Sequence, residues 1–186
     1  MNKEALLNAL DYVNHSREKR QEMATLILTN PHLIEPLLSI AFTVDNPISS
    51  RACWILEFTA KENLSYIFPY LNTFTISLHK VHLDSSVRPM AKICEYLTKS
   101  YFSKKETPCK KHLTNTHLER ITSNCFDWLI GDHKVAAQAY SMTSLLLLGR
   151  QYDWIYPELR MVLEQNYANG STAYKARARM TLEKIK

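Results

Sequence analysis

The sequence predicts an all-α fold, a stack of about five helical hairpins, and three observations lead to it. First, an Asp followed three positions later by an apolar residue, and four positions after that by Ala, recurs along the chain. Second, an Ile-x-Pro-x-Leu segment recurs upstream of these frames. Third, Gly occurs only 3 times in 186 residues, whereas the tight turns of all-β folds need many glycines. The hydrophobic share of 46% predicts a globular core.

The Asp frame predicts a turn that leads into a helix. Its clearest copy is Asp84-x-x-Val87-Arg88-x-x-Ala91. An Asp at a helix start accepts hydrogen bonds from free backbone N–H groups. The apolar residue and the Ala lie one turn apart on one face, where the small Ala lets a neighbouring helix approach. The other copies are Asp45/Ile48/Ala52, Asp132/Val135/Ala139 and, with Ser171 in the Asp position, Tyr174/Ala178, so that the four anchors lie 39, 48 and 39 residues apart.

The Ile-x-Pro-x-Leu segment predicts the first helix of each hairpin. Pro is tolerated in the first turn of a helix, because the N–H that it lacks would have no helical partner there. The segment occurs at 34–38, 67–71 and 155–159. Each unit is therefore a Pro-led first helix, an Asp turn and a second helix that carries the Ala.

A repeat of two helices with a period of about 40–47 residues resembles the HEAT and armadillo repeats. Asp84, Val87, Arg88 and Ala91 match the HEAT frame most closely, whereas Ser49 and Ala136 stand where the other frames should carry Arg. The resemblance covers about residues 31–186. It implies a right-handed α-α superhelix, a HEAT-like solenoid whose stacked antiparallel helix pairs serve as a binding surface.

Residues 1–30 are predicted to form a pair of helices outside the regular frames. A helix over 3–13 has Leu6 and Leu10 on one face, and Ser16 is a candidate N-cap for the next helix. Terminal repeats of solenoids are often atypical because one side faces water. We therefore interpret this pair as a capping hairpin.

The rest of the chain follows the two frames in order. Thr114 or Asn115 is expected to cap a helix, while Gly131 and Gly149 are expected to end helices. Apolar spacing predicts helices over 31–43, 47–62, 64–80, 86–102, 115–130, 133–149, 153–168 and 171–185. These helices form repeats at 31–62, 63–102, 114–149 and 153–186, in a single domain that spans 1–186.

A Lys-rich segment at 103–113 interrupts the pattern and is expected to be an exposed basic loop. The net charge of +5 is compatible with an acidic partner or with nucleic acid. The loop residues expected to contact phosphate or an acidic partner are Lys104, Lys105, Lys110 and Lys111.

The second helices carry the candidate partner-binding residues. On a solenoid, their side chains that turn away from the first helices would line the concave face, and Arg and aromatic residues are favoured at interface centres. The alternative is that Trp54 and Phe58 pack between repeats, since large aromatic residues also dominate cores. The candidates are Arg51, Trp54, Phe58, Arg88, Lys92, Tyr96, Tyr140 and Lys175.

No metal site or catalytic site is predicted. Cys109, His112 and His117, with Cys125 further on, match no standard zinc spacing. No Ser or Cys stands in a pattern that supplies a base and an oxyanion hole, and the scarcity of Gly argues against phosphate-binding loops. We therefore expect no metal and no cofactor. Whether the chain has any enzymatic activity stays open, although the pattern favours a non-enzyme.

The chain is expected to be cytoplasmic, with reduced thiols. It contains four Cys and no Cys-x-x-Cys pair. It does not open with a secretory signal, and no run approaches the ~20 apolar residues of a membrane span. No membrane association is predicted.

Three functions are compatible with this pattern. The first is a non-catalytic scaffold module that binds another protein or a peptide on the concave face. The alternative is a nucleic-acid-binding HEAT-like protein related to the alkylpurine DNA glycosylases, some of which have HEAT-like repeats. None of the catalytic positions of that family can be matched here. The third is self-association through the ends of the solenoid.

Overall fold

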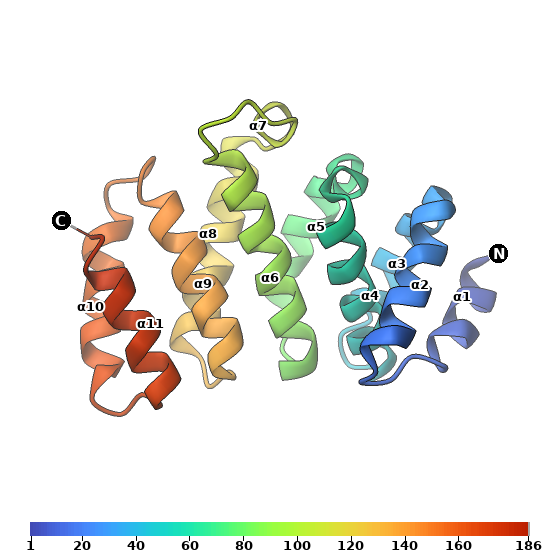
Figure 1. The fold of residues 1–186 in the computed structure, drawn as a ribbon, viewed down its shortest axis with the longest axis horizontal. Helices are drawn as coiled ribbons and strands as arrows, with labels where there is room; N and C mark the ends of the chain where they lie inside the picture. Colours follow the sequence, from blue (N-terminus) through green and yellow to red (C-terminus); the bar gives the residue numbers. More distant parts are fainter. Residues whose placement is uncertain (186) are drawn as a thin grey trace.

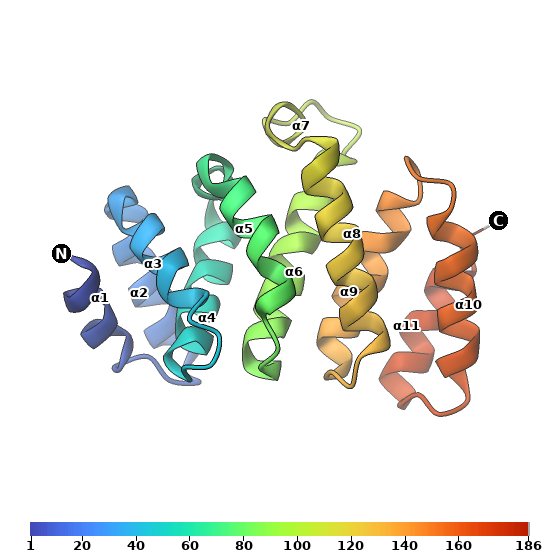
Figure 2. The same cartoon turned by 180° about the vertical axis from the view of Figure 1, so that it is seen from behind.

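The computed structural model describes residues 1–185, which form eleven α-helices and contain no strand. The predicted all-α class is therefore confirmed for this part of the chain. The helices lie in two layers, one nearer the viewer in Figure 1 and the other nearer the viewer in Figure 2. The first-helix layer contains α1 (Lys3–Leu10), α3 (Ile34–Ala41), α5 (Leu71–Ser77), α8 (Asn115–Ile130) and α10 (Ile155–Tyr167).

The second-helix layer is continuous from one end of the molecule to the other. Along it, each helix packs against the next, whereas contacts within the first-helix layer are sparser. Small and β-branched residues such as Ala52, Ala91 and Val87 are fully buried in this layer, which lets the helices approach closely. The layer contains α2 (Arg17–Thr29), α4 (Ile48–Glu62), α6 (Asp84–Tyr101), α9 (Val135–Leu148) and α11 (Thr172–Leu182).

The N-terminal pair differs from the expected hairpin. Three pairs of consecutive helices pack directly on each other, namely α3 with α4, α8 with α9, and α10 with α11. In contrast, α1 packs against α3 and α4, and α2 packs against α4. Helix α1 ends at Leu10 instead of reaching 13, and Val13 is buried in the connection to α2.

The expected helix over 64–80 is a composite. It begins as the 3-10 helix η2 (Leu64–Tyr70), continues as α5 and ends as η3 (Leu78–Lys80). Pro69 lies inside η2, where it lacks the N–H that a continuous α-helix would use. The helix expected from residue 31 also opens as a 3-10 turn, η1 (Pro31–Leu33).

The basic segment 103–113 is not entirely an exposed loop. It contains the short helix α7 (Cys109–His112), and Cys109 is fully buried, with its Sγ 3.4 Å from the carbonyl oxygen of Leu97. The reason is that the apolar thiol anchors the segment to α6. All four cysteines of the chain are buried and free, including Cys109, which lies in the segment predicted to be an exposed loop.

The predicted role of the Asp residues at the turns is wrong. Ser16 and Thr114 cap their helices as expected, but Asp84 is the first residue of α6 and caps nothing. Instead, its carboxylate lies 3.0 Å from Nδ1 of His133 in the turn of the next hairpin. Asp45 lies 3.6 Å from Nε2 of His82 in the same way. The turn carboxylates therefore link consecutive turns.

Candidate functional site

Charged and aromatic side chains of the second-helix layer surround a pocket at the edge where the hairpin turns lie. The pocket has a volume of about 390 Å³ and is centred on α2, α4 and the start of α6. We call it the Trp54 pocket. Its lining residues are His15, Arg17, Arg20, Trp54, Glu57, Phe58, Asp84, Ser85, Arg88 and Lys134.

The Trp54 indole forms the fixed wall of this pocket. Trp54 is only 9% exposed, and its Nε1–H donates a hydrogen bond of 2.8 Å to the carbonyl oxygen of Ser85 on α6. The ring of His15 packs at 5.2 Å from the indole, centroid to centroid. Both contacts cross between elements, so the position of the indole is set by the α1–α2 connection and by the docking of α6 on α4.

Arg20 lies over the aromatic wall. Its guanidinium carbon is 5.5 Å from the centre of the Trp54 ring and 5.4 Å from that of Phe58, within the range of a cation–π contact. Arg20 donates to the backbone carbonyls of Ser16 and His15 but has no carboxylate within 4 Å among residues 1–185. Burial lowers the pKa of Arg20, the nearby Arg88 lowers it further, and Glu57 opposes both effects.

The carboxylates of the pocket are already engaged. Arg88 donates two hydrogen bonds to Glu57, of 2.6 and 3.2 Å, in a bidentate pair. Asp84 faces His133. Arg17, Arg20 and Lys134 form no ion pair within the described part of the chain. The pocket therefore holds four cationic side chains against two carboxylates, and an incoming anion would meet unneutralised positive charge.

The structure brings together some of the predicted partner-binding residues. Trp54, Phe58 and Arg88 line the Trp54 pocket. Arg51 lines the adjoining pocket with Trp54, but it is paired with Asp11 at 2.7 Å. Lys175 lies on α11, which α6 and α9 separate from α4, and does not line the Trp54 pocket.

Lys92, Tyr96 and Tyr140 form a separate cluster that joins α6 to α9. The Lys92 ammonium lies 5.1 Å from the centre of the Tyr96 ring and 4.2 Å from that of Tyr140. Glu95 accepts from Lys92 and, at 2.7 Å, from Lys99. Burial and the carboxylates of Glu57 and Glu95 raise the pKa of Tyr96 to about 12. These groups satisfy one another, so the cluster chiefly fastens two helices.

Three cationic residues of the Trp54 pocket were not predicted from the sequence. Arg17 and Arg20 lie in the first turns of α2, where the sequence shows only a charged helix start, and Lys134 lies in the turn before α9. A signal was available for Arg20, because it lies about one turn into its helix, as Arg51 and Arg88 do. The Asp frame that marks the other helix starts is absent from the N-terminal pair.

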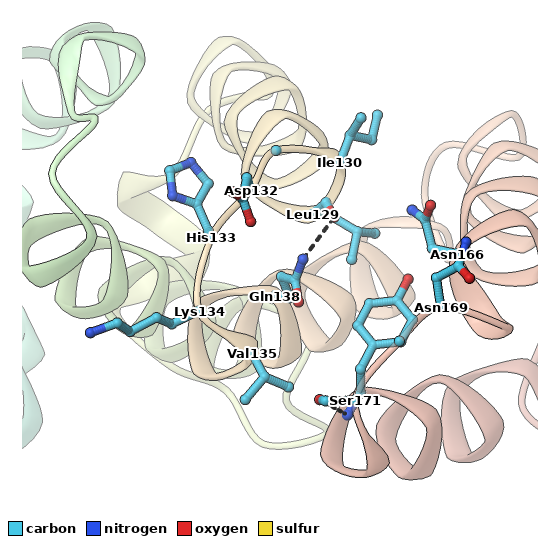
Figure 3. Close-up of a pocket in the computed structure, with 13 residues that line it drawn as sticks. Leu129, Ile130, Asp132, His133, Lys134, Val135, Gln138, Asn166, Asn169 and Ser171 are labelled. Atoms are coloured by element: carbon cyan, nitrogen blue, oxygen red, sulfur yellow. Dashed lines mark hydrogen bonds between the residues drawn. The ribbon is translucent and has the colours of Figure 1, made fainter.

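A second, larger pocket continues along the same edge (Figure 3). It has a volume of about 660 Å³ and lies between the α8–α9 turn and the α10–α11 turn. Lys134 lines both this pocket and the Trp54 pocket. Gln138 donates to the carbonyl of Leu129 at 3.4 Å, and Asn166 and Asn169 lie on the opposite side. The buried hydroxyl of Tyr174 has no hydrogen-bond partner among residues 1–185.

The basic loop lies at the other edge of the layers. Figure 1 places α7 beyond the C-terminal end of α6, whereas Asp84 and Ser85 of the Trp54 pocket lie at its N-terminal end. Lys104, Lys105 and Lys111 are exposed, while Lys110 is half-buried, with its Nζ 3.9 Å from Glu106. The loop and the pocket therefore do not form one cationic surface.

Neither a metal site nor a membrane span is found in residues 1–185. No group of three or more His, Cys, Asp or Glu side chains converges as metal ligands would. No helix combines the length and the apolar character that crossing a bilayer requires. Comparison of the chain with protein-family models, with curated proteins and with solved structures finds no match.

Proposed function

We propose that the chain is a small HEAT-like interaction module that binds an acidic segment of a partner protein along the second-helix layer. The tighter packing of this layer compared with the first-helix layer supports a superhelix with the second helices on its concave side. Concave faces of this kind are the usual binding surfaces of helical solenoids.

The observation that carries the proposal is the unneutralised charge beside an aromatic wall. Arg17, Arg20 and Lys134 lack carboxylate partners in the described part of the chain, and they flank Trp54 and Phe58. Arg and aromatic residues are favoured at the centres of protein interfaces. A partner carboxylate bound here would form charge-assisted hydrogen bonds with arginine that water screens only partly.

The shape of the edge favours an extended segment. Lys134 belongs to both the Trp54 pocket and the larger pocket of Figure 3, so a peptide backbone can follow the turns from α2 towards α11. Gln138, Asn166 and Asn169 offer amide groups that can hydrogen-bond such a backbone. Carboxylates would then occupy the Trp54 pocket and the backbone would occupy the second pocket.

Buried carboxylates disfavour nucleic acid as the ligand of this face. Glu57 and Glu95 lie along it and form ion pairs with Arg88, Lys92 and Lys99. Binding to a phosphate backbone depends on many uncompensated cations. The basic loop lies at the opposite edge, so its exposed lysines do not extend the pocket.

The test is selection of binding peptides from a random display library with the full chain as bait. We expect enrichment of peptides that carry several Asp or Glu residues, and the double variant Arg17→Glu/Arg20→Glu should weaken their binding by about tenfold or more. Lys104→Glu/Lys105→Glu is the matched control, since it changes the net charge by the same amount at the other edge. It should bind as the wild type does.

Two outcomes would overturn the proposal. One is enrichment of neutral or basic peptides, and the other is equal loss of binding in both double variants, which would indicate a non-specific charge effect. A titration with duplex DNA at two salt concentrations tests the alternative ligand, because binding that falls steeply with salt would favour nucleic acid.

A further inference from the structure

A small cavity on the opposite face of the molecule has a different chemistry. It lies between α8, which is nearer the viewer in Figure 2, and the α9–α10 turn that contains Tyr152 and Trp154. Its volume is about 320 Å³, at the lower end of the range of ligand-binding pockets. The lining residues that matter here are Glu119, Phe126, Asp127, Tyr152 and Trp154.

Aromatic rings form the wall of this cavity. Phe126 and Trp154 are stacked, with centroids 5.8 Å apart and ring planes inclined by 23°. Trp154 is 54% exposed, in contrast to Trp54 and Trp128, which are 9% and 3% exposed. The stacking holds the exposed indole in place, and the faces of aromatic rings carry partial negative charge.

The charged groups at the cavity are all acidic. Glu119 and Asp127 lie on the same side of α8 as Phe126, two turns apart, and neither forms an ion pair with any described residue. No Lys or Arg lines the cavity. Burial raises the pKa of Tyr152, and the Glu119 carboxylate raises it further. Although the chain has a net charge of +5, the charged side chains that line this cavity are therefore two carboxylates.

We propose that this cavity binds a quaternary ammonium group. Such a cation is attracted by the face of a Trp ring and by carboxylates at longer range, and its methyl groups cannot donate the hydrogen bonds that an unmodified ammonium must keep. The small volume suits a single head group. The group can belong to a free choline-like molecule or to a trimethylated lysine of another protein, and the two sources share the same recognition chemistry.

The test is a titration of the full-length protein, followed by NMR of the three Trp indole N–H groups. The Trp154 signal is assigned by its loss in Trp154→Phe. Choline should shift this signal and leave those of Trp54 and Trp128 unchanged. The neutral isostere 3,3-dimethylbutan-1-ol has the same shape without the charge and should bind at least about fivefold more weakly. Peptides that carry a trimethylated or an unmodified lysine are titrated in the same way. A trimethylated peptide that binds more tightly than choline would indicate a protein source, and the reverse order would indicate a free molecule.

Variants separate this site from general electrostatics. Glu119→Gln/Asp127→Asn should weaken choline binding by about fivefold or more, whereas Glu4→Gln/Glu35→Gln, with the same change in net charge on exposed residues of other helices, should not. Circular dichroism checks that both variants fold. Equal affinity for choline and its neutral isostere, equal effects of the two double variants, or no shift with any of the ligands would each overturn the inference. None of these results bears on the Trp54 pocket, which lies in the other layer.

Discussion

Trp54 donates its indole N–H to the carbonyl of Ser85, the carbonyl that Pro89 leaves without a partner. In a regular α-helix the N–H of residue 89 would donate to the carbonyl of residue 85, but Pro89 lies inside α6 and has no N–H. The 2.8 Å bond from Trp54 on α4 takes its place. The carbonyl left free by the missing backbone hydrogen bond of α6 thereby positions the indole in the wall of the Trp54 pocket.

This relationship predicts a coupling between positions 54 and 89. Trp54→Phe leaves the Ser85 carbonyl without a donor and should cost about 1–2 kcal/mol of unfolding free energy beyond the loss of ring area. In a Pro89→Ala background, the backbone N–H of the introduced alanine can donate to the same carbonyl, and the cost of Trp54→Phe should fall by about 0.5–1 kcal/mol. Urea unfolding of the four proteins measures the coupling as a double-mutant cycle, and strict additivity would contradict it.

The Arg88–Glu57 pair predicts a second stability effect. Glu57 has a side chain only 10% exposed, so Arg88→Met would leave a carboxylate with little access to water. We expect Arg88→Met to lower the free energy of unfolding by about 2–4 kcal/mol. The double variant Glu57→Gln/Arg88→Met removes the stranded charge and should be less destabilised than Arg88→Met alone.

Lys99→Met is the control for this pair, because its side chain is 53% exposed and Glu95 keeps Lys92 as a partner. It should cost less than about 1 kcal/mol. Urea unfolding at one pH compares all of these variants. If Arg88→Met were as mild as Lys99→Met, the pair would contribute only as a surface ion pair does.

Local signals in the sequence predicted where the helices lie. Ser16 and Thr114 accept hydrogen bonds from backbone N–H groups at helix starts, and Gly131 and Gly149 end helices, because each of these effects involves residues within one turn of one another. The spacing of apolar residues also predicted the buried face of α6, including Val87 and Ala91. These features depend only on sequence separations of a few residues.

Contacts between elements could not be predicted in the same way. The Asp residues at the turns have the right composition for helix caps, but Asp84 faces His133, which is 49 residues away. The residue that the Asp84 carboxylate contacts depends on how far one hairpin is shifted along the next. The contacts of Trp54 with Ser85 and of Arg20 with Trp54 also depend on how the helices dock. The sequence therefore predicts Trp54, Phe58 and Arg88 as binding residues but not the cations around them.

The capping box at α8 predicts a pH effect. Thr114 accepts from the His117 N–H through Oγ1, and its own backbone N–H donates to Nδ1 of His117, at 3.2 Å. Burial lowers the pKa of His117 from its ordinary value of 6.5, Arg120 lowers it further, and a hydrogen bond involving the backbone of His112 opposes this. The neutral ring is thus favoured in the folded state, because a protonated Nδ1 cannot accept.

The lowered pKa determines how the stability of the fold changes with pH. The contribution of His117 is fully present above about pH 6.5 and is lost as the pH falls through the lower pKa of the folded state. His117→Gln keeps a side-chain acceptor at the same helix position but does not titrate. Between pH 7.5 and pH 5 the wild type should lose about 1 kcal/mol or less relative to His117→Gln, measured by urea unfolding at each pH. Parallel losses in the two proteins would show that the ring nitrogen has no such role.

Gly149 predicts a steric effect with a single identified cause. Its φ of −60° suits any residue, but an added Cβ would lie 2.0 Å from Cε1 of Tyr156. The Tyr156 hydroxyl donates to the carbonyl of Leu146 at 3.3 Å, so the ring cannot move without losing this bond. Gly149→Ala should therefore cost about 1–3 kcal/mol.

The same substitution in a Tyr156→Ala background should be nearly neutral, within about 0.5 kcal/mol, because the ring that the Cβ meets is gone. Gly149→Ala removes no hydrogen-bonding group, and Ala has a higher helix propensity than Gly, so a loss that depends on Tyr156 can only be steric. Thermal and urea unfolding of the four proteins provide the comparison. If Gly149→Ala destabilised both backgrounds equally, the cause would lie in the backbone at the end of α9, and the α9–α10 turn would owe its conformation to Gly149 and not to the packing of Tyr156.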